Sequence, residues 1–102
     1  MACREELPHL IELYKQHRAQ GLQVVGITNE DADTARKFAK QQQVPYPILV
    51  DKDGSVFLQF QAESIPHTVL LDKQGRAAGM ASGYSAERFA EIELLTEQLL
   101  KE

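Results

Sequence analysis

Apolar residues recur three or four positions apart in two segments, one near each end of the chain. In the first segment they are Leu7, Leu10, Ile11 and Tyr14. In the second they are Phe89, Ile92, Leu95 and Leu99. This spacing puts each set on one face of a helix, so it predicts helices over residues 4–20 and from Ser85 to about residue 100. Ser85 is a favourable N-cap, and Gly21 stands where a helix commonly ends.

The middle of the chain alternates between strand-like and helix-like patterns. Residues 22–27 form a β-branched run that predicts a buried strand. Residues 32–43 predict a second helix, with three small or aromatic residues on its inner face. They are Ala35, Phe38 and Ala39. Two prolines within residues 44–47 end that helix, and residues 48–50 are a short candidate strand.

The segment after residue 50 is less clear. Residues 51–54 are typical of a turn, and residues 55–62 combine strand propensity with a helical apolar face. That face consists of Val56, Phe57 and Phe60, and it favours a helix. Residues 69–72 and 76–81 predict a β-hairpin in which Gly75 supplies the positive φ angle. The resulting order of elements indicates one α/β domain over residues 1–102.

Composition and charge exclude several classes of function. The net charge is −4, and acidic and basic residues are interleaved, which argues against a nucleic-acid interface. No apolar run is long enough to cross a membrane, and charges within residues 1–10 argue against a signal peptide. One cysteine excludes an internal disulfide, and three scattered histidines give no metal-site spacing. Phosphate-loop, dinucleotide and Ser-His-Asp patterns are absent from the sequence.

Cys3 is the residue best suited to act as a nucleophile. It lies at the start of the first predicted helix and precedes Arg4, and both features favour a thiolate. Glu5 and Glu6 oppose that effect, although they also suit the positive end of the helix dipole. An ordinary thiol near a chain end is the alternative interpretation.

Two motifs resemble those of the thioredoxin-like superfamily, and in particular the TlpA/ResA group of thiol-disulfide oxidoreductases. The first is Cys3 to Pro8, in which a proline follows a helix-initiating cysteine by five residues. The second is Ser64 to Gly75, which resembles the cis-proline loop that runs into a strand, an aspartate and a turn. Residues 28–62 resemble an insertion carried by that group.

The resemblance implies roles for three residues. Cys3 matches the resolving cysteine of a Cys-x-x-Cys motif, whose nucleophilic cysteine would precede Cys3 by three positions. Pro66 matches the cis-proline, and Ile65 would be its substrate-facing neighbour. His67 could form an activated Cys–His pair, but a partly exposed loop histidine is the favoured interpretation.

The resemblance also implies a strand upstream of Cys3, at the centre of the sheet. In the group this strand pairs on one side with the strand matching residues 22–27 and on the other with the strand matching 69–72. We therefore expect an N-terminally truncated domain that does not fold as an ordinary thioredoxin monomer. Either the strands pair anew, or a second copy supplies the missing pairing in a homo-oligomer.

The implied activity is dithiol–disulfide exchange with protein thiols and disulfides, in a periplasmic or otherwise extracytoplasmic compartment. No prosthetic group is implied. This chain alone is expected to be inactive or impaired, because the first cysteine of the motif is missing. A thioredoxin-like peroxidase is a second hypothesis. A non-catalytic, self-associating interaction module is a third.

Overall fold

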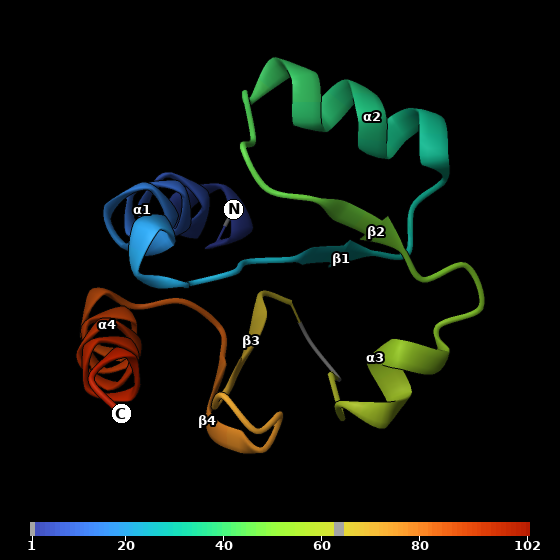
Figure 1. Cartoon of the computed structure of the whole chain (residues 1–102). Helices are drawn as coiled ribbons and strands as arrows, with labels where there is room; N and C mark the ends of the chain where they lie inside the picture. Colours follow the sequence, from blue (N-terminus) through green and yellow to red (C-terminus); the bar gives the residue numbers. More distant parts are fainter. Residues whose placement is uncertain (1, 63–64) are drawn as a thin grey trace.

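The chain folds into an arrangement of helices around two short sheets (Figure 1). The computed structural model describes residues 2–62 and 65–102. In chain order the elements are α1 (Ala2–His17), η1 (Arg18–Gln20, a 3-10 helix), β1 (Gly26–Thr28), α2 (Ala32–Gln41), β2 (Ile48–Val50), α3 (Ser55–Gln59), β3 (His67–Leu71), β4 (Ala77–Ser82) and α4 (Ala86–Leu100). The expected mixture of helices and strands is confirmed.

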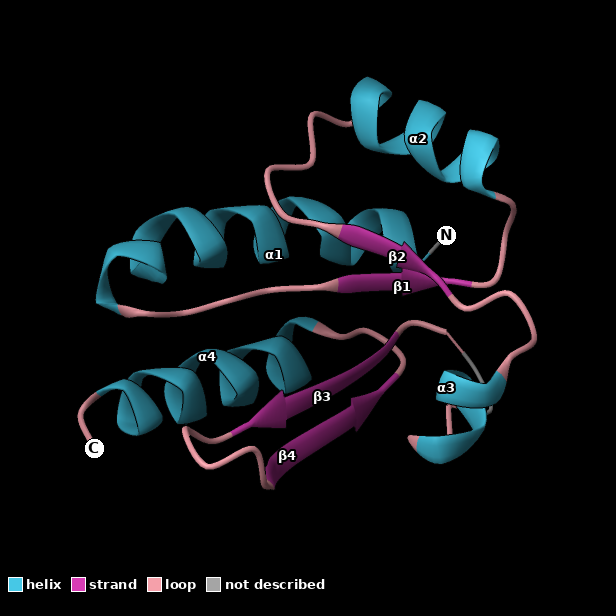
Figure 2. Ribbon diagram, turned by 45° about the vertical axis from the view of Figure 1, so that its right-hand side comes forward, coloured by secondary structure: helices cyan, strands magenta, loops and turns pink. Residues whose placement is uncertain are grey.

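The strands form two separate two-stranded sheets. β1 pairs with β2 in parallel, and β3 pairs with β4 in an antiparallel hairpin. Figure 2 shows β1 and β3 as the inner strands of the two sheets, with α1 and α4 on the same side of them. Within residues 2–62 and 65–102, β1 and β3 do not pair with each other or with a third strand.

Two strand predictions need correction. The strand expected over residues 22–27 is confined to Gly26–Thr28, because its partner β2 spans only three residues and nothing described pairs with residues 22–25. The hairpin strands begin and end one or two residues from their expected bounds, because β3 starts directly after Pro66 and β4 extends to Ser82. The turn itself is confirmed, with Gly75 at a φ of 82°.

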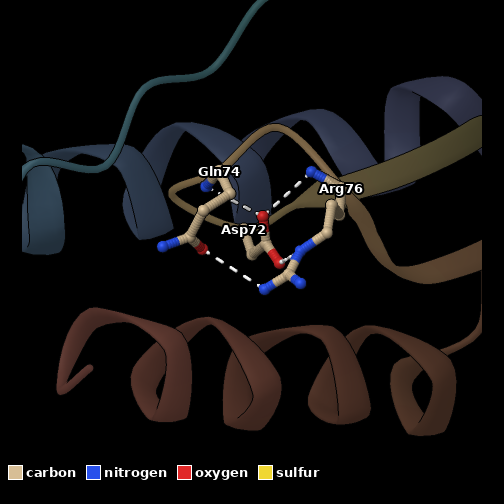
Figure 3. A network of polar contacts seen from close by, with 3 residues as sticks. All are labelled: Asp72, Gln74 and Arg76. Carbon is tan, nitrogen blue, oxygen red and sulfur yellow. Dashed lines mark hydrogen bonds and ion pairs between the residues drawn. The ribbon is translucent and has the colours of Figure 1, made fainter.

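The hairpin turn is organised by one carboxylate (Figure 3). Asp72 accepts hydrogen bonds from the backbone N–H groups of Gln74 and Arg76, each at 2.9 Å. The Arg76 guanidinium pairs with the same carboxylate at 2.9 Å and also reaches the Gln74 side chain. The backbone N–H of Arg76 holds the pKa of Asp72 below its ordinary value. Asp72 is therefore a structural residue of the turn.

The helix ends follow the capping signals in the sequence. Asp31 accepts from the Thr34 N–H at the start of α2, and Gly21 ends the first helical segment at a φ of 108°. At the start of α3, the buried Asp51 carboxylate accepts from the N–H groups of Val56 and Phe57. The helix expected over residues 55–62 is correct in type, but it covers only Ser55–Gln59.

Ser85→Ala tests the cap of α4. The Ser85 hydroxyl accepts from the Arg88 N–H at 3.1 Å, and losing an N-cap of this kind costs about 1 kcal/mol. We expect that loss in the free energy of unfolding by urea. Ser55→Ala, at an exposed position of α3, is the matched control and should change stability by less than about 0.5 kcal/mol. Equal effects of the two substitutions would contradict the capping role.

The core is small and lies between the helices and the sheets. Its most buried apolar residues are Leu13, Ala35, Tyr46, Phe89 and Ile92. Thr96 is 2% exposed and donates its hydroxyl proton to the Ile92 carbonyl within α4. The expected apolar face of α3 is partly wrong, because Phe60 is exposed. The expected stripe of α1 is also displaced, because its most buried positions are Glu6 and Leu13.

The chain exposes more surface than a compact monomer of its size. Its accessible area is 7399 Å², whereas folded monomers of this mass expose about 5,800 Å². Apolar side chains of both sheets contribute to the excess: Ile27 is 41% exposed, Leu49 55% and Met80 60%. The surface beside the two sheets is therefore unusually apolar for a chain that works alone.

Candidate functional site

Helix α1 carries the only cysteine. Cys3 is the second residue of that helix, in its first turn. The structure describes the backbone of Cys3 but not its side chain, so only its position in the helix is used. Residues three apart on a helix share a face, so Glu6 lies on the same side of α1 as Cys3, one turn further on.

Glu6 joins α1 to β3. Its side chain is buried, at 5% exposure, and its Oε1 accepts a hydrogen bond of 3.1 Å from the Thr68 hydroxyl. Burial raises the pKa of the Glu6 carboxyl, and the Thr68 hydrogen bond and His9 offset part of that rise. Burial, together with the nearby Glu6 charge, raises the pKa of Tyr46 to about 12. Glu6 is thus a partly desolvated acid between two elements far apart in sequence.

A small cavity lies beside this hydrogen bond. Glu6 and Thr68 line one side of it, and Tyr84, Ser85 and Arg88 contribute polar groups to the rest. His9 of α1 stacks on the Tyr84 ring, with centroids 5.8 Å apart. The start of α1 is therefore packed against the segment that joins β4 to α4.

The predicted substrate loop precedes β3. The Ile65–Pro66 peptide bond is cis, the isomer that the family resemblance implied. Ile65 is 58% exposed, and the Pro66 carbonyl accepts from the Gly83 N–H at 2.8 Å. Ser64, which belongs to the same motif, lies outside the described residues. Thr68, two residues after Pro66, donates a hydrogen bond to Glu6, so the strand that follows this loop meets α1 in the fold.

His67 differs from its sequence prediction. It is the first residue of β3 rather than a loop residue, and it is half-buried. Its Nδ1 lies 3.0 Å from the Ser82 hydroxyl, and its Nε2 lies 3.1 Å from the Phe60 carbonyl oxygen. Both ring nitrogens therefore have protein partners, which supports a structural role and not an activated Cys–His pair.

Within the described ranges, no cluster of three His, Cys, Asp or Glu side chains could hold a metal ion. Across those same residues, none of the helices is long and apolar enough to span a bilayer.

Glu6 is the site residue that the sequence prediction missed. From the sequence, Glu6 is a first-turn acid that suits the helix dipole and opposes a thiolate at Cys3, and its burial is not predicted. Glu6, Leu10 and Leu13 are spaced at i, i+4 and i+7, so they share one face of α1. An acid within an apolar stripe was the signal that could have identified it.

Glu6→Gln tests the burial of this carboxyl. A raised pKa in the folded state means that Glu6 favours folding below its ordinary pKa of 4.5 and loses that contribution as the pH rises through the folded pKa. Glutamine avoids the cost of ionisation and still accepts from Thr68. We expect the variant to gain thermal stability over the wild type from about pH 4 to pH 8, with nearly equal stability at the acid end.

Glu5→Gln is the matched control for this titration, because Glu5 is an exposed neighbour. It should show no comparable gain. A Glu6→Gln variant whose stability parallels that of the wild type across the whole pH range would contradict a buried, raised carboxyl.

A model of the AhpC/TSA family matches residues 1–78, which is most of the chain. This chain belongs to the AhpC/TSA family. The match spans both segments of the candidate site, from Cys3 in α1 to the Ile65–Pro66 loop. It ends in β4, so α4 lies beyond the matched part.

Curated relatives of this AhpC/TSA chain are named thiol-disulfide oxidoreductase ResA. One from Bacillus thuringiensis subsp. konkukian is 29% identical over 75 residues, covering 72% of this chain and 43% of the relative. The chain spans about half the length of the curated relatives it matches. The family assignment predicted from the two motifs is thereby confirmed.

Solved structures show the fold. A protein of Chlorobium tepidum named as a thiol:disulfide interchange protein DsbE matches with a TM-score of 0.90, at 21% identity, covering 97% of this chain and 71% of that chain. A protein of Neisseria meningitidis named as a thioredoxin matches with a TM-score of 0.80, at 22% identity, covering 93% of this chain and 65% of that chain. The fold of this AhpC/TSA chain is thioredoxin-like, as predicted.

Proposed function

We propose that this chain is one thioredoxin-like domain, over residues 1–102, of a thiol-disulfide oxidoreductase that exchanges disulfides with protein substrates. The observation that carries the proposal is the Glu6–Thr68 hydrogen bond, which joins residues 62 positions apart in sequence. Through it, the helix that begins around Cys3 is attached to the strand that follows Ile65 and Pro66. The ResA names of the curated relatives support the same chemistry.

Three residues have proposed roles in this reaction. Cys3 is the resolving cysteine, and Ile65 and Pro66 form the substrate-binding loop. The exposure of Ile65 supports its role, because an apolar side chain in solvent is available to a polypeptide. No prosthetic group is needed for exchange between sulfur atoms.

The chemistry explains why one thiol is not enough for turnover. In these 102 residues no second cysteine can act as the nucleophile, so the Cys3 thiolate itself attacks one sulfur of a substrate disulfide, a new disulfide forms to Cys3, and the other substrate sulfur leaves as a thiolate. Release of the captured substrate needs a second thiol to attack the mixed disulfide. With one cysteine in its 102 residues, this chain stops at the mixed disulfide unless an external thiol completes the step.

Mixed-disulfide trapping tests the proposal. The chain is incubated with an oxidised cysteine-containing peptide at about pH 8, and adducts are followed by mass spectrometry. We expect one adduct per chain, reversed by dithiothreitol and absent from Cys3→Ser. We also expect peptide capture to be about tenfold faster than capture of hydroxyethyl disulfide, because a substrate loop binds the peptide before exchange. Equal rates for the two disulfides would argue against a protein-disulfide substrate.

We also propose that the protein acts outside the cytoplasm on protein thiols and disulfides. The support is the resemblance to the TlpA/ResA group and the ResA relatives. The proposal predicts that the oxidised and reduced forms of natural client proteins are found in an extracytoplasmic fraction.

Self-association is the second proposal, favoured by the two separate sheets. β1 and β3 each have one strand partner within residues 2–62 and 65–102, so their other edges are available to a further strand. A second copy of the chain could pair with these edges and cover part of the excess apolar surface. On this basis the chain could also work as a non-catalytic interaction module, and the insulin assay of the extended chain in the Discussion distinguishes the two uses, because such a module would stay inactive even with the added cysteine.

A further inference from the structure

We infer that His67 is a positioning residue that holds the Ile65–Pro66 loop against α3 and β4. This inference rests on the proposed function, because it gives that loop a substrate. His67 follows the loop directly, and its two ring nitrogens contact the C-cap of α3 and the last residue of β4.

The partner of the Nε2 atom determines whether that atom carries a hydrogen. A carbonyl oxygen only accepts, so at 3.1 Å from the Phe60 carbonyl oxygen the Nε2 atom carries hydrogen and donates it. Phe60 is the C-cap of α3, where helix carbonyls lack partners within the helix. The imidazole therefore fastens the end of α3 to the start of β3.

The Nδ1 atom makes the second attachment. In the neutral imidazole it accepts from the Ser82 hydroxyl, 3.0 Å away. Ser82 is the cross-strand partner of His67, so the two side chains lie on the same face of the hairpin. A protonated ring would donate to the same hydroxyl, because a hydroxyl can act as donor or acceptor. The attachment therefore survives either charge state of the ring.

Neighbouring contacts show that the loop is held from several directions. The Gly83 N–H donates to the Pro66 carbonyl at 2.8 Å, and Arg88 donates to the Ser82 carbonyl. Gly83 has a φ of 77°, so its backbone adopts a conformation that suits glycine. Thr68 points to the opposite face of β3, where it is bonded to Glu6. Successive residues thus attach the loop to α3 on one face and to α1 on the other.

The test compares variants that keep or remove each attachment. His67→Leu removes both, and Ser82→Ala removes the one at Nδ1. His67→Gln places an amide N–H where it can still donate to the Phe60 carbonyl. Each variant is reacted through Cys3 with the oxidised peptide and with hydroxyethyl disulfide, a small disulfide that makes no use of a peptide-binding loop. The protection of the Gly83 N–H from hydrogen exchange, followed by NMR, reports whether the loop is held in place. This measurement needs no reaction at Cys3.

We expect His67→Leu to slow peptide capture about tenfold and to leave hydroxyethyl disulfide unchanged, with His67→Gln recovering to within about threefold of the wild type. Protection of the Gly83 N–H should fall in His67→Leu and return in His67→Gln. Unchanged peptide capture in His67→Leu, or equal slowing of both disulfides, would overturn the inference.

The same experiment separates this inference from the proposed function. If the wild type shows no preference for the peptide, the proposed substrate class fails, and the Gly83 protection then decides whether His67 positions the loop. If His67→Leu does not fold by circular dichroism, Ser82→Ala and His67→Gln carry the comparison. Normal Gly83 protection in Ser82→Ala together with loss in His67→Gln would show that neither ring contact acts as inferred.

Discussion

We expect an upstream extension of this chain to reduce insulin at least about a hundredfold faster than the 102-residue chain does. The extension adds one strand, and its last residue, directly before Met1, is a cysteine. The added cysteine creates a Cys-x-x-Cys with Met1 and Ala2 between the two thiols. The added cysteine forms the mixed disulfide with the substrate, and Cys3 then attacks that disulfide within the same molecule, at an effective concentration far above that of an external thiol. Insulin turbidity with dithiothreitol measures the rate.

Two matched variants make the result specific. A serine in place of the added cysteine keeps the upstream strand and removes the second thiol, and Cys3→Ser in the extended version removes the resolving thiol. Both should return the rate to that of the 102-residue chain. Equal activity of the extended version and its serine variant would contradict the resolving role of Cys3. Rapid consumption of peroxide without insulin reduction would favour the peroxidase hypothesis.

The second large effect concerns association. We expect the 102-residue chain to form dimers or larger assemblies at tens of micromolar, and Ile27→Pro to weaken that association by about tenfold or more. The excess of accessible surface over a compact monomer is about 1,600 Å² per chain, twice the ~800 Å² that each partner buries in a standard interface. Light scattering after size-exclusion chromatography over a range of concentrations measures the change.

The choice of Ile27 follows from the hydrogen bonds of β1. The Gly26 N–H donates to the Pro47 carbonyl, and the Thr28 carbonyl accepts from the Asp51 N–H, so these residues bond toward β2. Alternation along a strand then directs the Ile27 N–H and carbonyl toward the free edge. Proline at this position blocks the free edge and leaves the β1–β2 bonds in place.

Ile27→Thr is the control, because it keeps the N–H and the strand propensity while removing apolar area. If association depends on strand pairing, threonine should weaken it much less than proline. A chain that is monomeric at all concentrations would contradict self-association. Equal effects of threonine and proline would assign the interface to the apolar face instead of the strand edge.

The sequence predicted the helices better than the strands, for a physical reason. The helices α2 and α4 carry their own signals, namely the caps Asp31 and Ser85 and a local apolar face. A strand also needs a partner, and the length of β1 is determined by β2, about twenty residues further along the chain. Residues 22–25 have strand propensity but no described partner, so propensity alone overextended the prediction.

The candidate site shows the same division. Cys3 and the Ile65–Pro66 loop were identified by motif, because their spacing is a local property of the sequence. Glu6 and His67 acquire their roles through contacts with Thr68, Ser82 and Phe60, which only the fold brings together. His67 was therefore assigned to a loop, and Glu6 to the helix dipole.

The Glu6–Thr68 hydrogen bond also has a thermodynamic consequence. Thr68 donates to the carboxylate, so this bond stabilises the ionised form of Glu6 and lowers its pKa. Burial outweighs this bond and raises the pKa of Glu6 overall, so by reciprocal linkage the ionisation of Glu6 weakens the packing of α1 against the start of β3. The protonation of Glu6 on α1 and the position of a loop some sixty residues further along the chain are therefore thermodynamically coupled.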